Sequence, residues 1–170
     1  KIILMLYVPQ CMTHQSYQRT RMSFILKVHT INQLRTGQFS AVDLENLLEE
    51  LETIGRNQKR TIKSLLIKLL VHLLKLKCWD SERERNQGHW QGEIRTFRRE
   101  IKDELKDSPS LKPYILEIFD ECYQEARKEA SDRSQLSIDK FPLVPIGSLE
   151  QILDENWFLE NNCNHDDKAD

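Results

Sequence analysis

The feature that most constrains this chain is a leucine-rich stretch, residues 57–77, with apolar side chains on almost every side of a helix. Its main face comprises Ile62, Leu65, Leu66, Leu69, Leu70, Leu73 and Leu76. The far side carries Ile67, Val71 and Leu74. A helix that is apolar nearly all round is typical of the centre of a bundle. Lys63, Lys68 and Lys75 argue against a membrane span. We therefore expect a central helix on which the others pack.

Apolar residues at helical spacing predict the remaining elements. The expected helices cover about 23–36, 43–54, 89–106 and 113–133, with a short helix at 148–154. Gly37 is placed to end the first helix, and Ser40, three residues before Asp43, resembles a capping box for the second. Gly55 predicts a stop or a kink, and the charged stretch 78–88 predicts a flexible linker.

The composition favours an all-α fold. Charged residues make up 31% of the 170 residues and aromatic residues 8%, with only five glycines and five prolines. A β-sandwich would need more turn residues, and this length is that of one domain. We expect an all-α, single-domain helical bundle of about five main helices plus a short C-terminal helix.

The ends of the chain are expected to lie outside this domain, which we place at residues 22–160. Residues 1–21 are interpreted as a leader, with Met22, just before the first helix pattern, as the candidate natural start. The apolar run at 2–8 is too short to cross a bilayer, and no small-residue cleavage site follows it. Residues 161–170 are expected to form a flexible tail.

The cysteines indicate neither disulfides nor zinc. Cys11, Cys78, Cys122 and Cys163 lie far apart and form no CxxC pair, which fits reduced thiols in a cytoplasmic protein. Cys163 with His165 would supply only two of the ligands that zinc needs. No metal or cofactor is predicted.

The charge is unevenly distributed. Residues 56–106 carry fourteen basic and seven acidic side chains, whereas residues 107–170 carry six basic and fifteen acidic ones. A basic middle and an acidic end are explained most simply by internal complementarity, with binding to DNA as the less economical interpretation.

The helix at 89–106 offers a nucleic-acid hypothesis. Arg95, Arg98 and Arg99 could contact phosphates, and Trp90 could stack on a base. However, Trp90 and Phe97 occupy apolar stripe positions, and the helix has about as many acids as bases. Core packing with surface ion pairs is therefore the favoured interpretation.

His72 offers a second hypothesis. Glu49 or Glu52 could reach it if the helices before and after Gly55 fold back as a hairpin, which is how bundles place carboxylate and imidazole ligands. The repeated Glu-x-x-His pairs of di-metal proteins are missing. A partly buried histidine with a hydrogen-bonded neighbour is therefore favoured over a metal ligand or catalytic base.

Two further places could bind a partner. Arg83 lies in a charged cluster, 80–85, that could form a binding rim or a solvated loop. Tyr123 and Arg127 could orient a ligand or simply contact each other. The sequence contains no GxGxxG, P-loop, GxSxG or HExxH motif, and no catalytic residue is predicted.

Seven segments in order resemble the bacterial domain-of-unknown-function 29 family. They are DLENLLEELETIGR (43–56), LLVHLLKLK (69–77), the HW-xxx-IRTFRREI stretch (89–101), DSPSLKPY (107–114), CYQEARKEAS (122–131), FP (141–142) and LEQILDENWFL (149–159). The resemblance implies an all-helical domain without an established activity. It draws attention to the matching polar positions Glu49, Glu50, Arg56, His72, Arg95, Arg99 and Arg127.

The expected function is that of a small protein-interaction or regulatory module. The alternatives are a metal-binding or enzymatic bundle that uses His72 with Glu49 or Glu52, and nucleic-acid binding through Arg95, Arg98 and Arg99. A protein partner is expected, nucleic acid is disfavoured, and no membrane contact is expected. The candidate binding residues are Glu49, His72, Arg83, Arg95, Arg99 and Arg127.

Overall fold

A computed structural model describes residues 27–158 of the chain, so the predicted leader at 1–21 and tail at 161–170 lie outside the described residues. Between residues 27 and 158 the chain forms helices and turns and no β-strand, which confirms the all-α prediction. The chain divides into two compact units between Thr53 and Ile54. The boundaries of a single domain at 22–160 remain a prediction.

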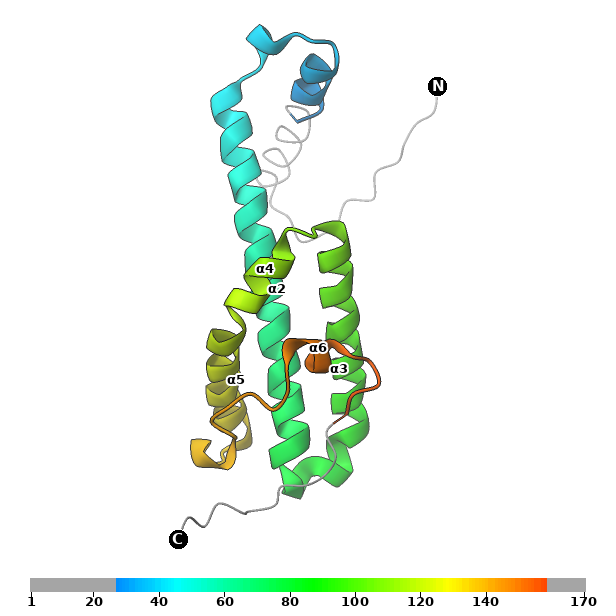
Figure 1. Cartoon of the computed structure of the whole chain (residues 1–170), viewed down its shortest axis with the longest axis vertical. Helices are drawn as coiled ribbons and strands as arrows, with labels where there is room; N and C mark the ends of the chain where they lie inside the picture. The colour runs from blue at the N-terminus through cyan, green and yellow to red at the C-terminus, as the bar shows by residue number, and fades with distance from the viewer. Residues whose placement is uncertain (1–26, 159–170) are drawn as a thin grey trace, which may run out of the picture. The chain divides into compact units, whose positions relative to one another are not determined.

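The elements are short at both ends of the described chain and long in its middle (Figure 1). In chain order they are a helical segment at 27–35, η1 (Phe39–Ala41), α2 (Leu44–Cys78), α3 (Asp80–Asp107), α4 (Leu111–Glu117), α5 (Phe119–Ser134), η2 (Ile138–Lys140) and α6 (Leu149–Leu153).

The first unit is a helical hairpin formed by the segment 27–35 and the start of α2. Gly37 ends the first helix, as predicted: its φ is 73°, and the N–H of Gln38 reaches back to the carbonyl of Gln33 at 2.9 Å. The cap of α2 is Asp43, whose carboxylate accepts from the backbone N–H of Asn46 at 3.2 Å. The prediction that Ser40 caps this helix was wrong, because Ser40 lies inside η1.

The predicted stop or kink at Gly55 does not occur. Residues 44–54 and 57–77, expected to be two helices, are parts of the 35-residue helix α2. One glycine costs a helix only about 1 kcal/mol relative to alanine, and Glu52, Arg56 and Gln58 close to it are good helix formers. The glycine therefore lowers the stability of the helix without ending it.

The predicted linker at 78–88 is also helical. Only Trp79 separates α2 from α3, which begins at Asp80. The charge of this stretch suggested a loop, but its glutamates and arginines are good helix formers. Asn86 adds a local bond by donating to the carboxylate of Glu82 at 2.8 Å.

The helix expected at 113–133 begins earlier and is interrupted. Leu111 opens α4, and Ile118, with φ −88° and ψ −1°, separates α4 from α5. The break leaves Ile118 itself buried. Gln135, which has φ 58°, ends α5 in the left-handed conformation.

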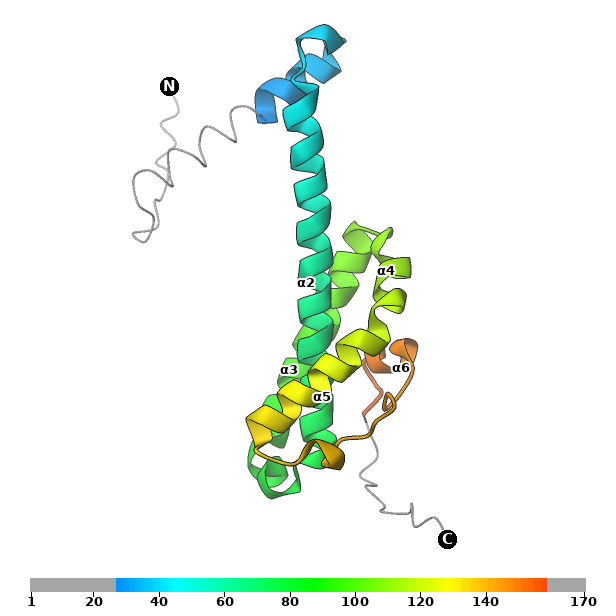
Figure 2. The ribbon, with the colours of Figure 1, turned by 90° about the vertical axis from the view of Figure 1, so that its left-hand side faces the viewer.

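The core of the second unit surrounds the later part of α2, which lies between α3 and α5 (Figures 1 and 2). Leu66, Leu69 and Leu73 have no exposed surface, and Trp90 of α3 is buried against the same cluster. The central helix predicted from residues 57–77 is thus confirmed for this unit. From α5 the core receives the small residues Cys122, Ala126 and Ala130.

An ion-pair bridge connects α2 to α5 over this core. The ammonium group of Lys63 lies 2.7 Å from the carboxylate of Glu121 and 2.8 Å from that of Glu125. Internal complementarity was expected between the basic stretch 56–106 and the acidic stretch 107–170, and here two acids of α5 meet a lysine of the central helix. Both carboxylates raise the pKa of Lys63.

After α5 the chain crosses back over the second unit and forms α6. Ser148 begins α6 with a capping box, in which its hydroxyl accepts from the backbone N–H of Gln151 and the Gln151 side chain accepts from that of Ser148. This confirms the short helix expected at 148–154. Gly147 is required here, because a Cβ atom on it would lie 2.9 Å from the ring of Trp157.

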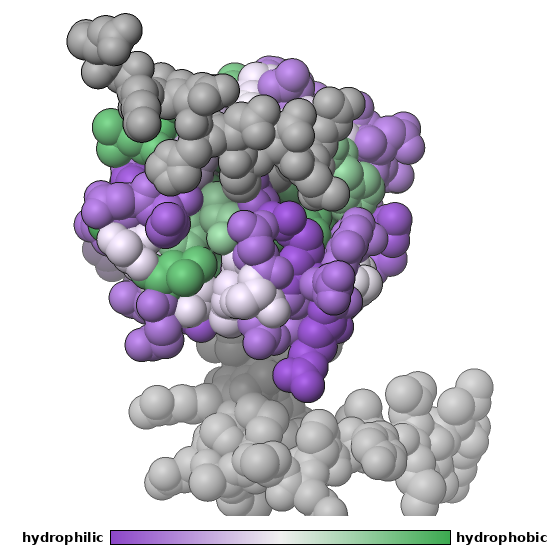
Figure 3. Space-filling model, turned by 90° about the horizontal axis from the view of Figure 1, so that it is seen from below, coloured by the Kyte–Doolittle hydropathy of each residue, from purple (hydrophilic) through white to green (hydrophobic). Residues whose placement is uncertain are grey.

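Figure 3 shows one face of the molecule. Hydrophilic residues predominate on it, and hydrophobic residues form smaller areas between them. No helix within residues 27–158 combines the length and apolar character needed to cross a membrane.

Candidate functional site

The six predicted binding residues do not form one site. Glu49 belongs to the first unit, while the others belong to the second, where His72 lies on α2, Arg83, Arg95 and Arg99 on α3, and Arg127 on α5. No hydrogen bond, ion pair or ring contact within the described range joins any two of them. Each is therefore considered in its own surroundings.

Arg83 holds the junction between α2 and α3. Its Nε donates to the carbonyl of Leu76 at 2.9 Å and its terminal nitrogen to that of Lys77 at 2.6 Å. It also forms an ion pair with Asp80. The last carbonyls of a helix lack partners within the helix, and a basic side chain can satisfy them. Arg83 thus caps α2, and its place in a binding rim stays a prediction.

Arg127 and Tyr123 hold the segment that follows α5. The guanidinium of Arg127 donates to the carbonyl of Phe141 at 3.1 Å, and the hydroxyl of Tyr123 donates to that of Pro142 at 2.9 Å. Both side chains are buried, and burial raises the pKa of Tyr123. Both groups donate to backbone carbonyls, which supports the structural interpretation of the pair.

Arg98 is a structural residue that sequence reasoning missed. It has no exposed surface, and its guanidinium donates to the carbonyls of Ile152 at 2.7 Å and Trp157 at 2.7 Å, with a longer contact to Glu155 at 3.4 Å. Burial lowers its pKa. Arg98 follows Ile94 by four positions, so it falls within the apolar stripe, and that position could have indicated its burial.

The nucleic-acid hypothesis named Arg95, Arg98 and Arg99. Arg98 is buried, so it cannot contact a phosphate. Arg95 is exposed, and its guanidinium lies 5.3 Å from the ring centre of Phe158. Arg99 is exposed and makes no hydrogen bond or ion pair inside the described range. Trp90 is buried and stacks on Trp79 at 5.6 Å, so it is not free to stack on a base.

His72 is half-buried between α2 and α3, as expected for a structural histidine. Its Nδ1 donates to the carbonyl of Lys68 at 2.8 Å, and its ring lies 5.4 Å from that of Phe97. A carbonyl can only accept, so Nδ1 carries the proton and Nε2 of the neutral ring keeps its lone pair. Burial is the main cause that lowers the pKa of His72, with Lys75 adding to it.

The conditions for a metal site at His72 are not met in this structure. Glu49 or Glu52 could have reached His72 only if the chain folded back as a hairpin at Gly55. This hairpin does not form, because α2 continues through Gly55. Residues 27–158 contain no group of three or more histidine, cysteine or acidic side chains that could hold a metal ion.

A buried lysine lies one turn after His72. The ammonium of Lys75 is 5.8 Å from the ring centres of both Trp79 and Trp90. Burial lowers its pKa, and the charge of Arg133 acts in the same direction. The aromatic rings compensate part of the lost hydration through cation–π attraction. From the sequence, Lys75 was one of a series of lysines on the central helix, and nothing in the pattern indicated this contact.

The leucine stripe, defined here as Leu44, Leu48 and Leu51 of α2, is the most prominent exposed feature of the first unit. These side chains are 60%, 59% and 56% exposed, respectively. Their spacing places them on one helical face. The helix expected at 43–54 was located by this apolar spacing, and the spacing is the same whether or not something covers the face.

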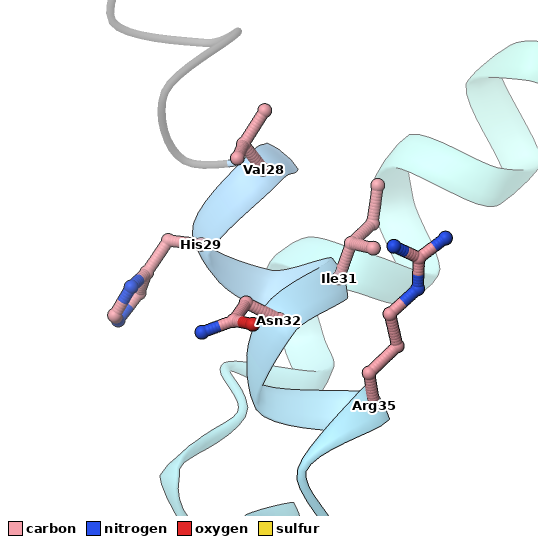
Figure 4. Close-up of a pocket in the computed structure, with 5 residues that line it drawn as sticks. All are labelled: Val28, His29, Ile31, Asn32 and Arg35. Atoms are coloured by element: carbon pink, nitrogen blue, oxygen red, sulfur yellow. The ribbon is translucent and has the colours of Figure 1, made fainter.

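The preceding helix is also apolar and exposed. Val28 is 50% and Ile31 48% exposed, and a hollow of about 570 Å³ has His29, Asn32 and Arg35 in its lining as well. Figure 4 shows Ile31 and Arg35 on one side of the helix and His29 and Asn32 on the other. All five described lining residues come from one helix.

Comparison with known proteins identifies a family relationship over most of the chain. The model of the family described as "Domain of unknown function DUF29" matches residues 27–158. No curated protein and no solved structure matches the chain.

Proposed function

The chain belongs to the DUF29 family of domains of unknown function, and we propose that it is a protein-interaction module. The observation that carries this proposal is the leucine stripe of the first unit, with each side chain more than half exposed. Surface leucines scattered singly need no explanation, whereas an exposed apolar face on a helix is typical of a binding surface.

The second unit supports the proposal as a scaffold. Two of its buried polar side chains, Arg98 and Arg127, donate to backbone carbonyls of the same unit. No buried polar side-chain atom of the described residues lacks a hydrogen-bond partner. The polar groups of this interior are therefore occupied in holding the fold, and the surface of the first unit is the better candidate for a functional contact.

The energetics favour docking of a partner on the stripe. Full burial of a leucine side chain contributes about 1.5–3 kcal/mol, and each stripe residue still has more than half of its surface in solvent. Three such residues could thus contribute a few kcal/mol. Helical partners commonly recognise apolar residues at this spacing on one face.

The proposal is tested by comparing two leucine-to-glutamate variants. Leu51→Glu places a charge in the stripe, and Leu116→Glu makes the same change on α4 at an identical exposure of 56%. Proteins captured from source cells by the natural chain should be lost with Leu51→Glu and kept with Leu116→Glu. Equal capture by all three chains, with their folding verified by circular dichroism, would argue against the stripe as the contact surface.

A further inference from the structure

The described part of the first unit, residues 27–53, leaves most of its large apolar side chains exposed. Among residues 27–53 only Val42 is buried. The exposed large apolar residues of this stretch are Val28, Ile31, Leu34, Phe39, Leu44, Leu48 and Leu51. Short helices in water are marginal without a packed apolar face, and a surface this rich in half-exposed side chains marks an association site.

The charges of the hairpin are separated by helix. The segment 27–35 contains Lys27 and Arg35 and no acidic residue. Residues 43–53 contain five acidic side chains and no basic one, namely Asp43, Glu45, Glu49, Glu50 and Glu52. One ion pair, between Lys27 and Glu50 at 2.9 Å, joins the two helices. Glu45 and Glu49 form no ion pair within the described part of the chain.

This separation makes the hairpin complementary to itself. In a two-fold dimer the same patch is used by both copies, so any contact between two different helices occurs twice. If the basic helix of one copy lies against the acidic stretch of the other, opposite charges meet on both sides of the axis. The exposed leucines and isoleucines would then be enclosed between the helices, as in the core of a four-helix bundle.

We propose that the partner of this surface is a second copy of the chain, and that two hairpins associate through their apolar faces with basic and acidic helices opposed. This inference rests on the proposed function and names the partner of the same surface. A standard interface takes about 800 Å² from each partner, supplied by roughly 20–30 residues. The described hairpin, residues 27–53, has 27 residues in all, so contact through one of its faces gives an interface below this standard size.

The first test measures the mass of the full chain by sedimentation velocity. Concentrations from about 1 to 100 µM span the weak end of affinities for interfaces of this size. We expect a dimer for the natural chain and for Leu116→Glu, and a monomer for a Leu48→Glu, Leu51→Glu variant. A natural chain that is monomeric throughout this range overturns the inference, including the case in which another segment of the same chain covers the stripe.

The second test exchanges charges between copies. One variant, Arg35→Glu, reverses the basic helix, and another, Glu45→Lys with Glu49→Lys, reverses the acidic stretch. Each alone should dimerise at least about tenfold more weakly, because like charges then face each other twice. An equimolar mixture should recover a heterodimer, because both contacts are again between opposite charges. Absence of recovery in the mixture contradicts the opposed arrangement.

The outcomes separate this inference from the proposed function. A monomeric natural chain whose captured partners are still lost with Leu51→Glu rejects the second copy and leaves the interaction module standing. A monomeric chain whose captures are unaffected by Leu51→Glu rejects both. Circular dichroism of every variant shows whether the helices remain intact, and Leu116→Glu controls for the addition of a charge at an exposed leucine.

Discussion

The guanidinium of Arg98 lies inside the second unit. There it donates hydrogen bonds to backbone carbonyls of α6 and of the residues after α6, in place of the bonds that water would supply. Arg127 donates in the same way to a backbone carbonyl of the segment after α5, and Arg83 donates to a carbonyl at the end of α2. A buried charge is tolerated only when its hydration is replaced by hydrogen bonds. These arginines therefore hold irregular segments that have few backbone partners of their own.

Replacing Arg98 with methionine should lower the free energy of unfolding by about 2–4 kcal/mol. The change keeps an apolar side chain of similar length but leaves the carbonyls of Ile152 and Trp157 without donors. Arg99→Met is the matched control, since Arg99 is exposed, and should change it by less than about 0.5 kcal/mol. Urea unfolding measures both, and equal effects would contradict the structural role of Arg98.

The stability of the protein should fall as the pH is lowered through and below the ordinary pKa of His72, which is 6.5. Burial places the pKa of His72 in the folded chain below its ordinary value of 6.5, so the unfolded chain binds the proton more readily. Stability is then complete above the unfolded pKa and decreases as the pH falls towards the folded one. His72→Gln should flatten this dependence in urea titrations, and an unchanged slope would show that another group is responsible.

Gly147→Ala should destabilise the end of the chain. The new Cβ atom would lie 2.9 Å from two ring carbons of Trp157, so the ring must move. Overpacking of this kind costs about 1–3 kcal/mol. Thermal unfolding together with tryptophan fluorescence would measure both the loss and the ring displacement, and a neutral effect would show that Trp157 does not pack on this glycine.

At the scale of elements, the sequence identified most helices but misplaced the joints between them. The all-round apolar pattern of 57–77 sufficed for the buried part of α2, because few other environments suit such a helix. The positions of the helix ends depend on tertiary contacts, and helical periodicity in the sequence does not report these contacts. Arg83 caps the end of α2, so α3 can begin directly after it. The break at Ile118 has no glycine or proline at that position to indicate it in the sequence.

Gly55→Ala distinguishes the continuous helix from the predicted break. Nothing lies within 4 Å of a Cβ atom at Gly55, and its φ is not positive. Alanine should then stabilise the protein by about 0.5–1 kcal/mol, since it is the better helix former. Chemical unfolding of the variant measures the sign. A loss of stability would indicate that the chain turns at this glycine.

The candidate surface was less predictable than the fold. Apolar spacing predicted the helix that contains Leu44, Leu48 and Leu51, but the exposure of these leucines depends on what the rest of the chain leaves uncovered. The same limit applies to Arg98, whose role depends on carbonyls more than fifty residues away in the sequence. Helical periodicity reports which residues share a face, and it carries no information on which partner that face meets.

At the scale of the whole molecule, the two units contrast in how they use apolar residues. The second unit contains a core of buried residues from α2, α3, α4, α5 and α6. The first unit has one buried residue in its described part and an exposed stripe. We therefore regard the second unit as the part that carries the stability and the first as the part available for association.

Native-state hydrogen exchange tests the central claim, that residues 62–76 form the buried centre of the second unit. The amides of Leu66, Leu69, Leu70, Leu73 and Leu74, all without exposed surface, should exchange only through global unfolding. Their opening free energy should then equal the free energy of unfolding measured in urea. Exchange of these amides through small local openings, far faster than global unfolding allows, would contradict the account.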